Sequence, residues 1–221
     1  MKQIVIIGGG GLGRQALAQL TTDPAHGTEW SIAGFVDERG PQVIAPELQV
    51  PWLGYPAFFE PGPDHVFVSA VGDPHSRRLQ VEPLEAKGAQ FMSTVTRCLL
   101  GSRLRCGPTF FCYDVAVGVD SQFGSHGFFD HDALVGHDVV IGDYVHIGAR
   151  CVIAGYVKIG NEVLIHSGAL LARNITVGDG AVIGMGAVVL RDVPAGATVL
   201  GNPARVISST LGAPRDSSTG G

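Results

Sequence analysis

The order of apolar and polar residues divides the chain into two regions with different periodicities. Over residues 1–94, short apolar runs alternate with amphipathic stretches and Gly-rich turns. This alternation predicts a parallel sheet covered by helices, and Gly88 is placed to end the last helix. The expected strands are Gln3–Ile7, Ser31–Asp37 and His65–Ala70. One expected helix begins with Arg14–Leu20, and a second covers Pro74–Lys87.

A six-residue repeat begins near Val95. One position of the repeat is apolar in all thirteen units, the residue two before it is small or apolar, and the residue after it is Gly in eight units. This pattern predicts an interior ladder in triangular coils of eighteen residues, stacked about 4.8 Å apart, with Gly supplying backbone freedom at corners. The apolar positions are Val117, Phe123, Phe129, Val135, Ile141, Ile147, Ile153, Ile159, Ile165, Leu171, Val177, Ile183 and Val189.

Near the C-terminus, Pro194 is expected to break the repeat, so that Val193–Arg205 leaves the coils. The Ser- and Gly-rich tail, residues 213–221, is expected to be disordered. The predicted organisation is an α/β domain over 1–94 and a β-helix over 95–212.

Charge and composition exclude several classes of function. The net charge is −5 and no run of Lys or Arg occurs, so a nucleic-acid surface is not indicated. The apolar run Ile4–Ile7 is too short to insert into a membrane or to serve as a signal segment. The cysteines lack CxxC spacing and are expected to be reduced thiols of a cytoplasmic protein. They are Cys98, Cys106, Cys112 and Cys151.

The Gly-rich stretch Gly8–Gly13 fits GxGxxG between a strand and a helix, and Asp37 follows in a second strand. Three interpretations are open: a nicotinamide site, a nucleotide-sugar site or a tight structural turn. The short N-terminal region favours a nucleotide sugar, whose diphosphate would bind loop amides at the helix N-terminus. The candidate residues are Gly8, Gly10, Gly11, Leu12, Gly13, Arg14, Asp37, Gly72 and Asp73.

The motifs occur in the order KQIVIIGGGGLGRQA, GFVDE, AVGD (Ala70–Asp73), hexapeptides and DVPAGATVLGNPAR (Asp192–Arg205). This order resembles the left-handed β-helix sugar acetyltransferases of bacillosamine and sialic-acid pathways. The resemblance implies a small Rossmann-like N-terminal domain followed by an all-β left-handed parallel β-helix. It also implies a homotrimer, acetyl-CoA as co-substrate and no metal cofactor. The implied reaction is N-acetylation of an amino sugar linked to a nucleotide.

The segment GHDVVIGDYVHIGARCVIAG (Gly136–Gly155) is similar to the catalytic stretch of that family. Matched by position, the resemblance makes His137 the general base, Asp138 the group that orients it, and His146 a second histidine of the site. A neutral imidazole is suited to accept a proton from an amine or a hydroxyl at pH 7. The alternative for all three is a structural residue at a corner.

The same resemblance places acetyl-CoA between adjacent β-helices. Gly155 follows His137 by eighteen residues, one coil, and its amide is a candidate donor to the thioester oxygen. A corner glycine is the alternative. The candidate acetyl-CoA residues are His146, Gly155, Gly201, Asn202, Pro203 and Ala204.

Other positions leave alternatives open. Leu12 stands where the family carries a loop histidine near the acceptor sugar, which puts the acceptor in doubt. Arg77 and Arg78 are either phosphate contacts or part of a solvated helix face. The His126 and His131 spacing matches γ-class carbonic anhydrases, but the third ligand of a zinc site is missing. We therefore interpret both as corner or interface residues, and His166 has no assigned role.

Four hypotheses follow. The first is the N-acetyltransferase, and the second is an O-acetyltransferase for a sialic-acid-like or polysaccharide sugar, since one imidazole serves both nucleophiles. The third is a non-catalytic nucleotide-sensing trimer, which Leu12 favours. The fourth is an NAD-binding oxidoreductase, which the short N-terminal domain disfavours.

Overall fold

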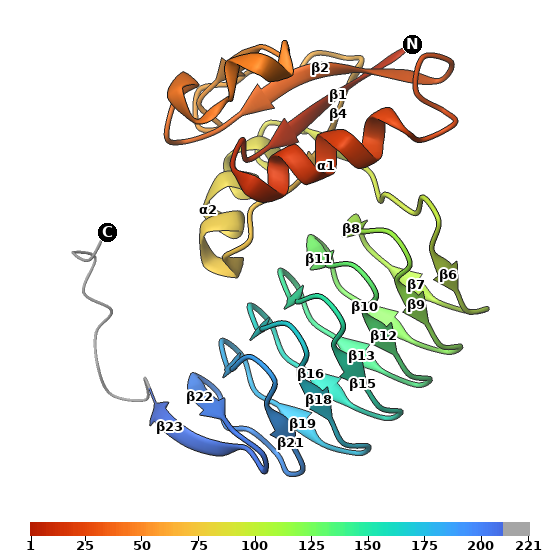
Figure 1. Ribbon diagram of the computed structural model, residues 1–221. Helices are drawn as coiled ribbons and strands as arrows, with labels where there is room; N and C mark the ends of the chain where they lie inside the picture. The colour runs from red at the N-terminus through yellow and green to blue at the C-terminus, as the bar shows by residue number, and fades with distance from the viewer. Residues whose placement is uncertain (210–221) are drawn as a thin grey trace.

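The computed structural model describes residues 1–209, in which an α/β region lies against one side of a β-helix (Figure 1). The elements of the first region are β1 (Lys2–Ile7), α1 (Gly11–Thr21), β2 (Trp30–Val36), the 3₁₀ turns Pro41–Val43 and Pro46–Leu48, β3 (Trp52–Gly54), β4 (His65–Ser69), α2 (Pro74–Glu85) and β5 (Gln90–Phe91). They form a parallel sheet in the order β3-β2-β1-β4-β5. The predicted strands and helices are confirmed, whereas the short outer strands β3 and β5 were not predicted.

Helices cover both faces of this sheet, because the central strand β1 is apolar on both sides. Ile4 and Ile6 face the cluster that contains Leu17 and Leu20 of α1. The alternate residues Val5 and Ile7 face Val81 and Leu84 of α2. A strand buried on both faces explains the continuous apolar run in the sequence.

The second region is a three-sided stack of parallel strands that we describe by its faces. The first face contains β6 (Leu99–Leu100), β9 (Ala116–Val117), β12 (Leu134–Val135), β15 (Val152–Ile153), β18 (Leu170–Leu171) and β21 (Val188–Val189). The second contains β7 (Arg105–Cys106), β10 (Gln122–Phe123), β13 (Val140–Ile141), β16 (Lys158–Ile159) and β19 (Thr176–Val177). The third contains β8 (Thr109–Phe111), β11 (Gly127–Phe129), β14 (His146–Ile147), β17 (Leu164–Ile165), β20 (Val182–Ile183), β22 (Ala197–Leu200) and β23 (Arg205–Ser209).

From β8 to β21, strands of neighbouring coils pair in a register of eighteen residues, as Leu134 with Val152 on the first face. The register is seventeen residues in the first coil and sixteen between β20 and β22. All thirteen predicted ladder residues are buried in one continuous core. The residues two positions before each ladder residue are buried as well. Ser121 is the polar residue of this column and Gly127 the smallest. The repeat prediction is therefore confirmed.

The reason for the recurrent glycines differs from the prediction. None of the eight has a positive φ. A Cβ on Gly118 would lie 2.6 Å from the carbonyl carbon of Gly136 in the next coil, so close approach between coils excludes a side chain. The left-handed residues come two positions later, where φ is +61° at Asp120, for example. That column is Asp114, Asp120, His126, Asp132, Asp138, Tyr144, Arg150, Tyr156, Glu162, Gly168, Asn174, Gly180 and Gly186.

The chain was expected to leave the stack at Pro194, but it remains part of the stack. The segment Ala197–Leu200 adds β22 beside β20, and β23 then pairs with β22 in the antiparallel sense. The tail predicted to be disordered, residues 213–221, lies outside the described residues. Among residues 1–209, no helix is long and apolar enough to cross a membrane.

The two regions share a core on the third face of the β-helix. The outward rings of Phe110 and Phe128 belong to the cluster of Ile4 and Leu17. Apolar contact across the boundary therefore joins the α/β region to the first coils.

Arg77 and Arg78 link the same two regions, and the buried Arg77 is neither a phosphate contact nor part of a solvated helix face. Arg77 is fully buried and donates to the carbonyls of Val71 (2.7 Å) and Tyr144 (2.6 Å). Burial lowers its pKa to about 9, which leaves the guanidinium charged at neutral pH. Arg78 forms an ion pair with Glu162 at 3.2 Å.

Candidate functional site

The Gly-rich loop between β1 and α1 forms the wall of a cleft. Gly8 has a φ of +96°, and a Cβ on Gly13 would lie 1.9 Å from the Gly8 carbonyl oxygen. Both glycines are therefore required for the tight turn and for the close packing of α1. Helix α1 has no acidic residue in its first turn, and Gly10 caps it without a side chain. Its free amides make this end of the helix a site for an anion.

The cleft has a volume of about 670 Å³ and contains six of the nine residues predicted for the nucleotide sugar. These are Gly8, Gly10, Gly11, Leu12, Gly72 and Asp73. Sequence reasoning missed Gln15, Glu38, Arg39, Ser76 and Gln80, which also line it. Helical spacing was the available signal, because Gln15 lies one turn after Gly11 and Gln80 one turn after Ser76.

Asp37 takes a supporting position instead of facing this cleft. Its carboxylate is fully buried and accepts hydrogen bonds from the Gly9 amide (2.7 Å), the Arg39 amide (2.8 Å) and the Arg39 guanidinium (2.7 Å). Burial would raise the pKa of Asp37, but the hydrogen bonds from Arg39 and Gly9 lower it below its ordinary value. The carboxylate therefore braces the Gly-rich loop and orients Arg39 at the cleft.

Two further predicted residues shape the cleft. A Cβ on Gly72 would lie 3.1 Å from Cδ1 of Leu12, so the leucine packs close to the AVGD loop. Asp73 caps α2 and accepts a hydrogen bond from the Ser76 amide at 2.7 Å. Arg14 is exposed beside the cleft and is not part of its lining.

His137 and Asp138 lie at the corner that follows the first face, which we call the first corner. His137 Nδ1 and Asp138 Oδ2 are 2.8 Å apart, and both side chains are about half exposed. Asp138 has a φ of +56°, which turns the chain sharply after the histidine. With Nδ1 engaged, Nε2 of His137 is free to act as a base.

One coil further along the first corner lie Gly155 and Tyr156. A Cβ on Gly155 would be 2.9 Å from both Cε1 and Nε2 of His137, so only glycine fits beside this ring. Within residues 1–209 the Gly155 amide donates no hydrogen bond. The Tyr156 ring lies edge-on to the imidazole, with centroids 5.0 Å apart. The corner thus brings together an imidazole, a free amide and an aromatic ring.

His146 lies in strand β14 and not at a corner, so the structure does not bring it to His137. Its ring stacks on Phe128, with the ring centroids 5.3 Å apart. Burial and the nearby charge of Arg77 lower the pKa of His146 to about 4. The ring is therefore neutral at pH 7.

The predicted C-terminal residues Gly201–Ala204 form the turn between β22 and β23. Pro203 and Ala204 line a cavity of about 360 Å³ together with Leu190, Arg191 and Arg205. Arg191 was not among the predicted residues, although it continues the column of His137 at eighteen-residue spacing.

The three other histidines of the β-helix occupy the two remaining corners. His126 is buried at the second corner, where Nε2 lies 2.8 Å from a Glu85 oxygen and the ring stacks on Tyr144. It is an interface residue, as expected. His131 and the exposed His166 lie at the third corner, so His126 and His131 do not face one site.

Comparison with known proteins agrees with this architecture. Residues 156–191 match the family model of the bacterial transferase hexapeptide (six repeats). A comparison with curated proteins finds no match.

Three solved structures are similar over almost the whole chain. WeeI from Acinetobacter baumannii AYE is 26% identical with a TM-score of 0.84, covering 94% of this chain and 100% of its own. The acetyltransferase domain of PglB from Neisseria gonorrhoeae FA1090 in complex with acetyl coenzyme A is 27% identical with a TM-score of 0.83, covering 93% and 99%. PerB from Caulobacter crescentus in complex with CoA and GDP-perosamine is 26% identical with a TM-score of 0.80, covering 94% and 98%.

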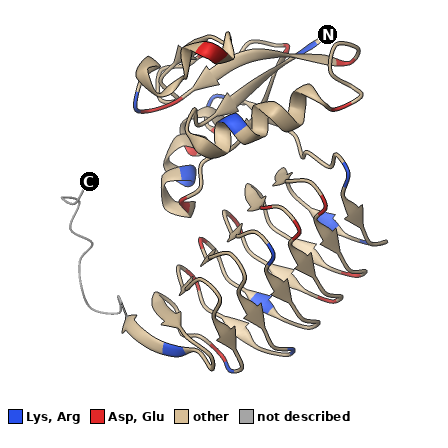
Figure 2. Ribbon diagram, viewed as in Figure 1, with Lys and Arg blue, Asp and Glu red and all other residues tan. Residues whose placement is uncertain are grey.

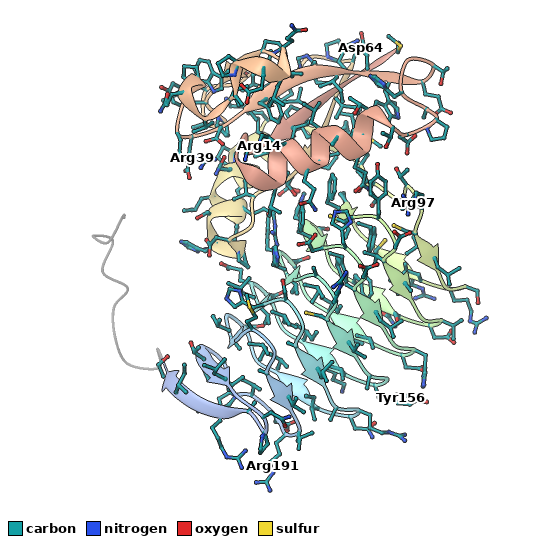
Figure 3. The ribbon with its side chains drawn as sticks, viewed as in Figure 1. Arg14, Arg39, Asp64, Arg97, Tyr156 and Arg191 are labelled. Atoms are coloured by element: carbon teal, nitrogen blue, oxygen red, sulfur yellow. The ribbon has the colours of Figure 1, made fainter. Side chains whose placement is uncertain are left out.

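The chain is a left-handed β-helix acyltransferase. In this acyltransferase the cleft and the first corner lie on different sides of the molecule. The second and third corners and the third face contact the α/β region, through pairs such as His126 with Glu85 and Asp130 with Gln15. Figure 3 shows Tyr156, the neighbour of His137, on the side away from Arg14 and Arg39.

Proposed function

We propose that this acyltransferase is an acetyl-CoA-dependent N-acetyltransferase that acts on a nucleotide-linked amino sugar, with His137 as general base, in a homotrimer. The observation that carries the proposal is the first corner, where Asp138 engages Nδ1 of His137 and Nε2 lies against Gly155. Similar structures contain acetyl coenzyme A in the PglB domain and CoA with GDP-perosamine in PerB. The cleft beside the Gly-rich loop suits the diphosphate of a nucleotide sugar.

The geometry supports a direct transfer. Nε2 of His137 accepts a proton from the sugar amine while the nitrogen attacks the thioester carbonyl. The Gly155 amide donates a hydrogen bond to the oxygen as negative charge develops on it. The tetrahedral intermediate then expels the CoA thiolate, which takes the proton from the imidazolium. Asp138 holds the other ring nitrogen and stabilises the cation, as the acid of a catalytic triad does.

A trimer is supported by the outward side of the first face, which is apolar throughout. Leu134, Val152 and Leu170 are 48%, 38% and 43% exposed on successive coils. The ladder consists of Leu99, Ala116, Leu134, Val152, Leu170 and Val188. A continuous exposed apolar stripe marks a protein interface, and a second copy of the chain offers the complementary surface.

The position of His137 supports the same assembly. His137 follows Val135 of the first face by two residues, so burial of the face would set the imidazole in a seam between copies. Its own cleft lies on the opposite side of the β-helix. An acceptor in the cleft of one copy would therefore meet the His137 of a neighbouring copy, and a single chain would hold only half of the site.

The positions of two arginines support a model in which acetyl-CoA extends from His137 along the seam between copies. Arg173 and Arg191 occupy the column of His137, two and three coils further on, about 10 and 14 Å along the stack. Both are exposed, and neither forms an ion pair among residues 1–209. An extended pantetheine arm spans this length. We propose that the two cations bind the CoA phosphates near Pro203 and Ala204.

The test is release of free thiol from acetyl-CoA with a panel of amino and hydroxyl sugar nucleotides. Release with an amino sugar nucleotide, and identification of the N-acetyl product by mass spectrometry, is the expected result. Release only with hydroxyl acceptors would replace the proposal by O-acetylation. Nucleotide binding without release for any acceptor would favour a sensing trimer. We also propose a cytoplasmic location, which the four free cysteines support.

A further inference from the structure

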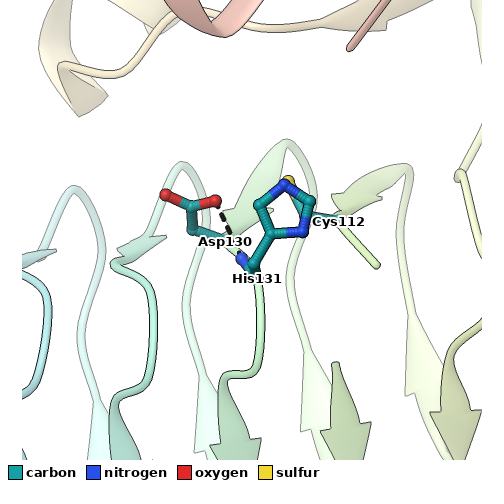
Figure 4. A group of neighbouring side chains, drawn as sticks. All are labelled: Cys112, Asp130 and His131. Carbon is teal, nitrogen blue, oxygen red and sulfur yellow. Dashed lines mark hydrogen bonds between the residues drawn. The ribbon is translucent and has the colours of Figure 1, made fainter. Parts of the chain in front are cut away.

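A cluster of potential metal ligands lies at the third corner, away from His137. Cys112 Sγ, a carboxylate oxygen of Asp130 and a ring nitrogen of His131 lie within 4.8 Å of one another (Figure 4). Cys112 and Asp130 hold equivalent positions on adjacent coils, since the Cys112 amide donates to the Phe129 carbonyl at 2.8 Å. The strand register that builds the β-helix therefore holds two of the donors side by side.

The sequence departs from the repeat at this corner. The position after each ladder residue is most often Gly, because a side chain there meets the next coil. On the third corner this column carries Asp130 and His166 instead, and Cys112 continues it on the preceding coil. Replacement of the favoured glycine by residues with ligating atoms is thus concentrated on the corner beside the α/β region.

Helix α1 supplies a fourth polar group. The Gln15 side-chain amide donates to Cys112 Sγ at 3.3 Å and to Asp130 Oδ1 at 3.0 Å. It occupies the place where a cation would join these two acceptors. Within the described chain, neither ring nitrogen of His131 forms a hydrogen bond, whereas the Asp130 carboxylate also accepts one from the Cys112 thiol. The His131 ring nitrogens are therefore available to a metal ion, whereas at Cys112 the ion must displace the thiol proton, because burial raises the pKa of this thiol.

We propose that Cys112, Asp130 and His131 bind a zinc ion that joins α1 to the third corner. A thiolate and an imidazole select zinc over magnesium or calcium, and three protein ligands leave one open position in a tetrahedral site. The ion would displace Gln15 Nε2 from between these two residues, and the amide would then turn Oε1 toward the open position. Since Gln15 also lines the nucleotide cleft, the ion would fix one side of the cleft. None of these residues lies at the corner of His137, so the ion takes no part in the proton transfer or the acyl transfer proposed there.

The experiment uses the full chain without a histidine tag, freed of metal by a chelator and titrated with Co²⁺. We expect saturation at one equivalent, with the visible bands of tetrahedral Co²⁺ and a thiolate-to-cobalt charge-transfer band. Zn²⁺ at about a hundredfold excess over its Kd should raise the Tm by roughly 5–10 °C.

Variants assign the ligands. Cys112→Ser should abolish the charge-transfer band, and His131→Gln should weaken Co²⁺ binding at least tenfold, whereas Cys106→Ser, at an exposed cysteine, should change neither. Circular dichroism of each metal-free variant checks that it is folded. Absence of saturable binding, or a charge-transfer band that persists in Cys112→Ser, would overturn the proposal.

Discussion

At the scale of the residue, the first corner depends on contacts that allow very little change. Gly155 has no room for a methyl group beside the imidazole, and Asp138 is placed to hold one tautomer of His137. Sequence reasoning found all three positions through the resemblance. It did not find Tyr156, because an aromatic ring one coil away becomes a neighbour only when the stack is formed.

Replacement of His137 by Ala tests the proposed base. We expect kcat to fall by about 10²–10⁴, since proton transfer by a positioned side chain contributes this factor. The Kd for acetyl-CoA should change less than twofold. Asp138→Asn should give an intermediate loss of kcat, because the ring keeps its place but loses the charge that stabilises the imidazolium.

Steady-state kinetics with the acceptor identified by the thiol-release assay provide the measurement, and isothermal titration gives the Kd. A variant His137→Ala with undiminished kcat would exclude His137 as the base. Loss of acetyl-CoA affinity to the same degree as kcat would instead indicate a structural role.

His146 should make stability depend on pH. Its pKa is lowered from 6.5 to about 4 in the folded protein, so the unfolded chain binds the additional proton between these values. Stability from this residue is therefore complete above pH 6.5 and decreases as the pH falls toward 4, by about 3 kcal/mol in total.

The measurement is the free energy of unfolding in urea at several pH values. His146→Gln, which cannot titrate, should flatten the difference between pH 6.5 and 4 relative to the native sequence. His166→Gln, at an exposed histidine, should leave the profile unchanged. An unaltered slope in His146→Gln would contradict the buried, neutral state of this ring.

At the scale of the element, the eighteen-residue register places residues eighteen apart above one another on successive coils, so that they form columns. It places His137, Gly155, Arg173 and Arg191 along one corner of the β-helix. Another column joins neighbouring coils by hydrogen bonds from a backbone amide to a side-chain oxygen, such as Asp143 N to Asn161 (2.8 Å) and Asn161 N to Asp179 (2.6 Å). Figure 2 shows that many of the acidic residues of the stack lie on its corners.

The arginine column gives a prediction of its own. Arg191→Ala and Arg173→Ala should each raise the KM for acetyl-CoA about tenfold, as expected when one contact to a charged phosphate is lost. The KM for S-acetylpantetheine, which carries no phosphate, should stay constant in both variants. Lys158→Ala, on the second face, is the matched control, and equal effects on both donors would contradict phosphate binding.

At the scale of the whole molecule, the apolar first face and the divided site point to the same assembly. The α/β region covers part of the third face, so the first face is open to another copy. The prediction is that a change on the first face removes both assembly and activity.

Val152→Glu together with Leu134→Glu should prevent the proposed trimer from forming and reduce kcat to background, because the His137 of one copy then has no neighbouring cleft. Val140→Glu is the control, since Val140 is 43% exposed on the second face. Light scattering after size-exclusion chromatography gives the mass, and circular dichroism verifies the fold. A double variant that stays trimeric, or a monomer with full activity, would contradict the proposed assembly.

The sequence by itself determined the β-helix, because position within a coil follows from local arithmetic: every sixth residue points inward and every eighteenth lies above its equivalent. It also located the Gly-rich turn, since Gly8 and Gly13 are required by backbone geometry within one loop. The close approach of coils at Gly118 is a contact between residues eighteen apart. There the repeat marked the glycine correctly, but the reason is the close packing of coils and not backbone freedom at a corner.

Only the tertiary structure decided how the α/β region docks on the third face. Docking buries Arg77 and His146, turns Asp37 into a brace for Arg39, and brings Gln15 to Cys112 and Asp130. These contacts join residues with no fixed separation in the chain, and the free energy that selects them comes from burying apolar area between two preformed surfaces. No periodicity encodes such a contact, which is why the predicted roles of these residues differed from their positions.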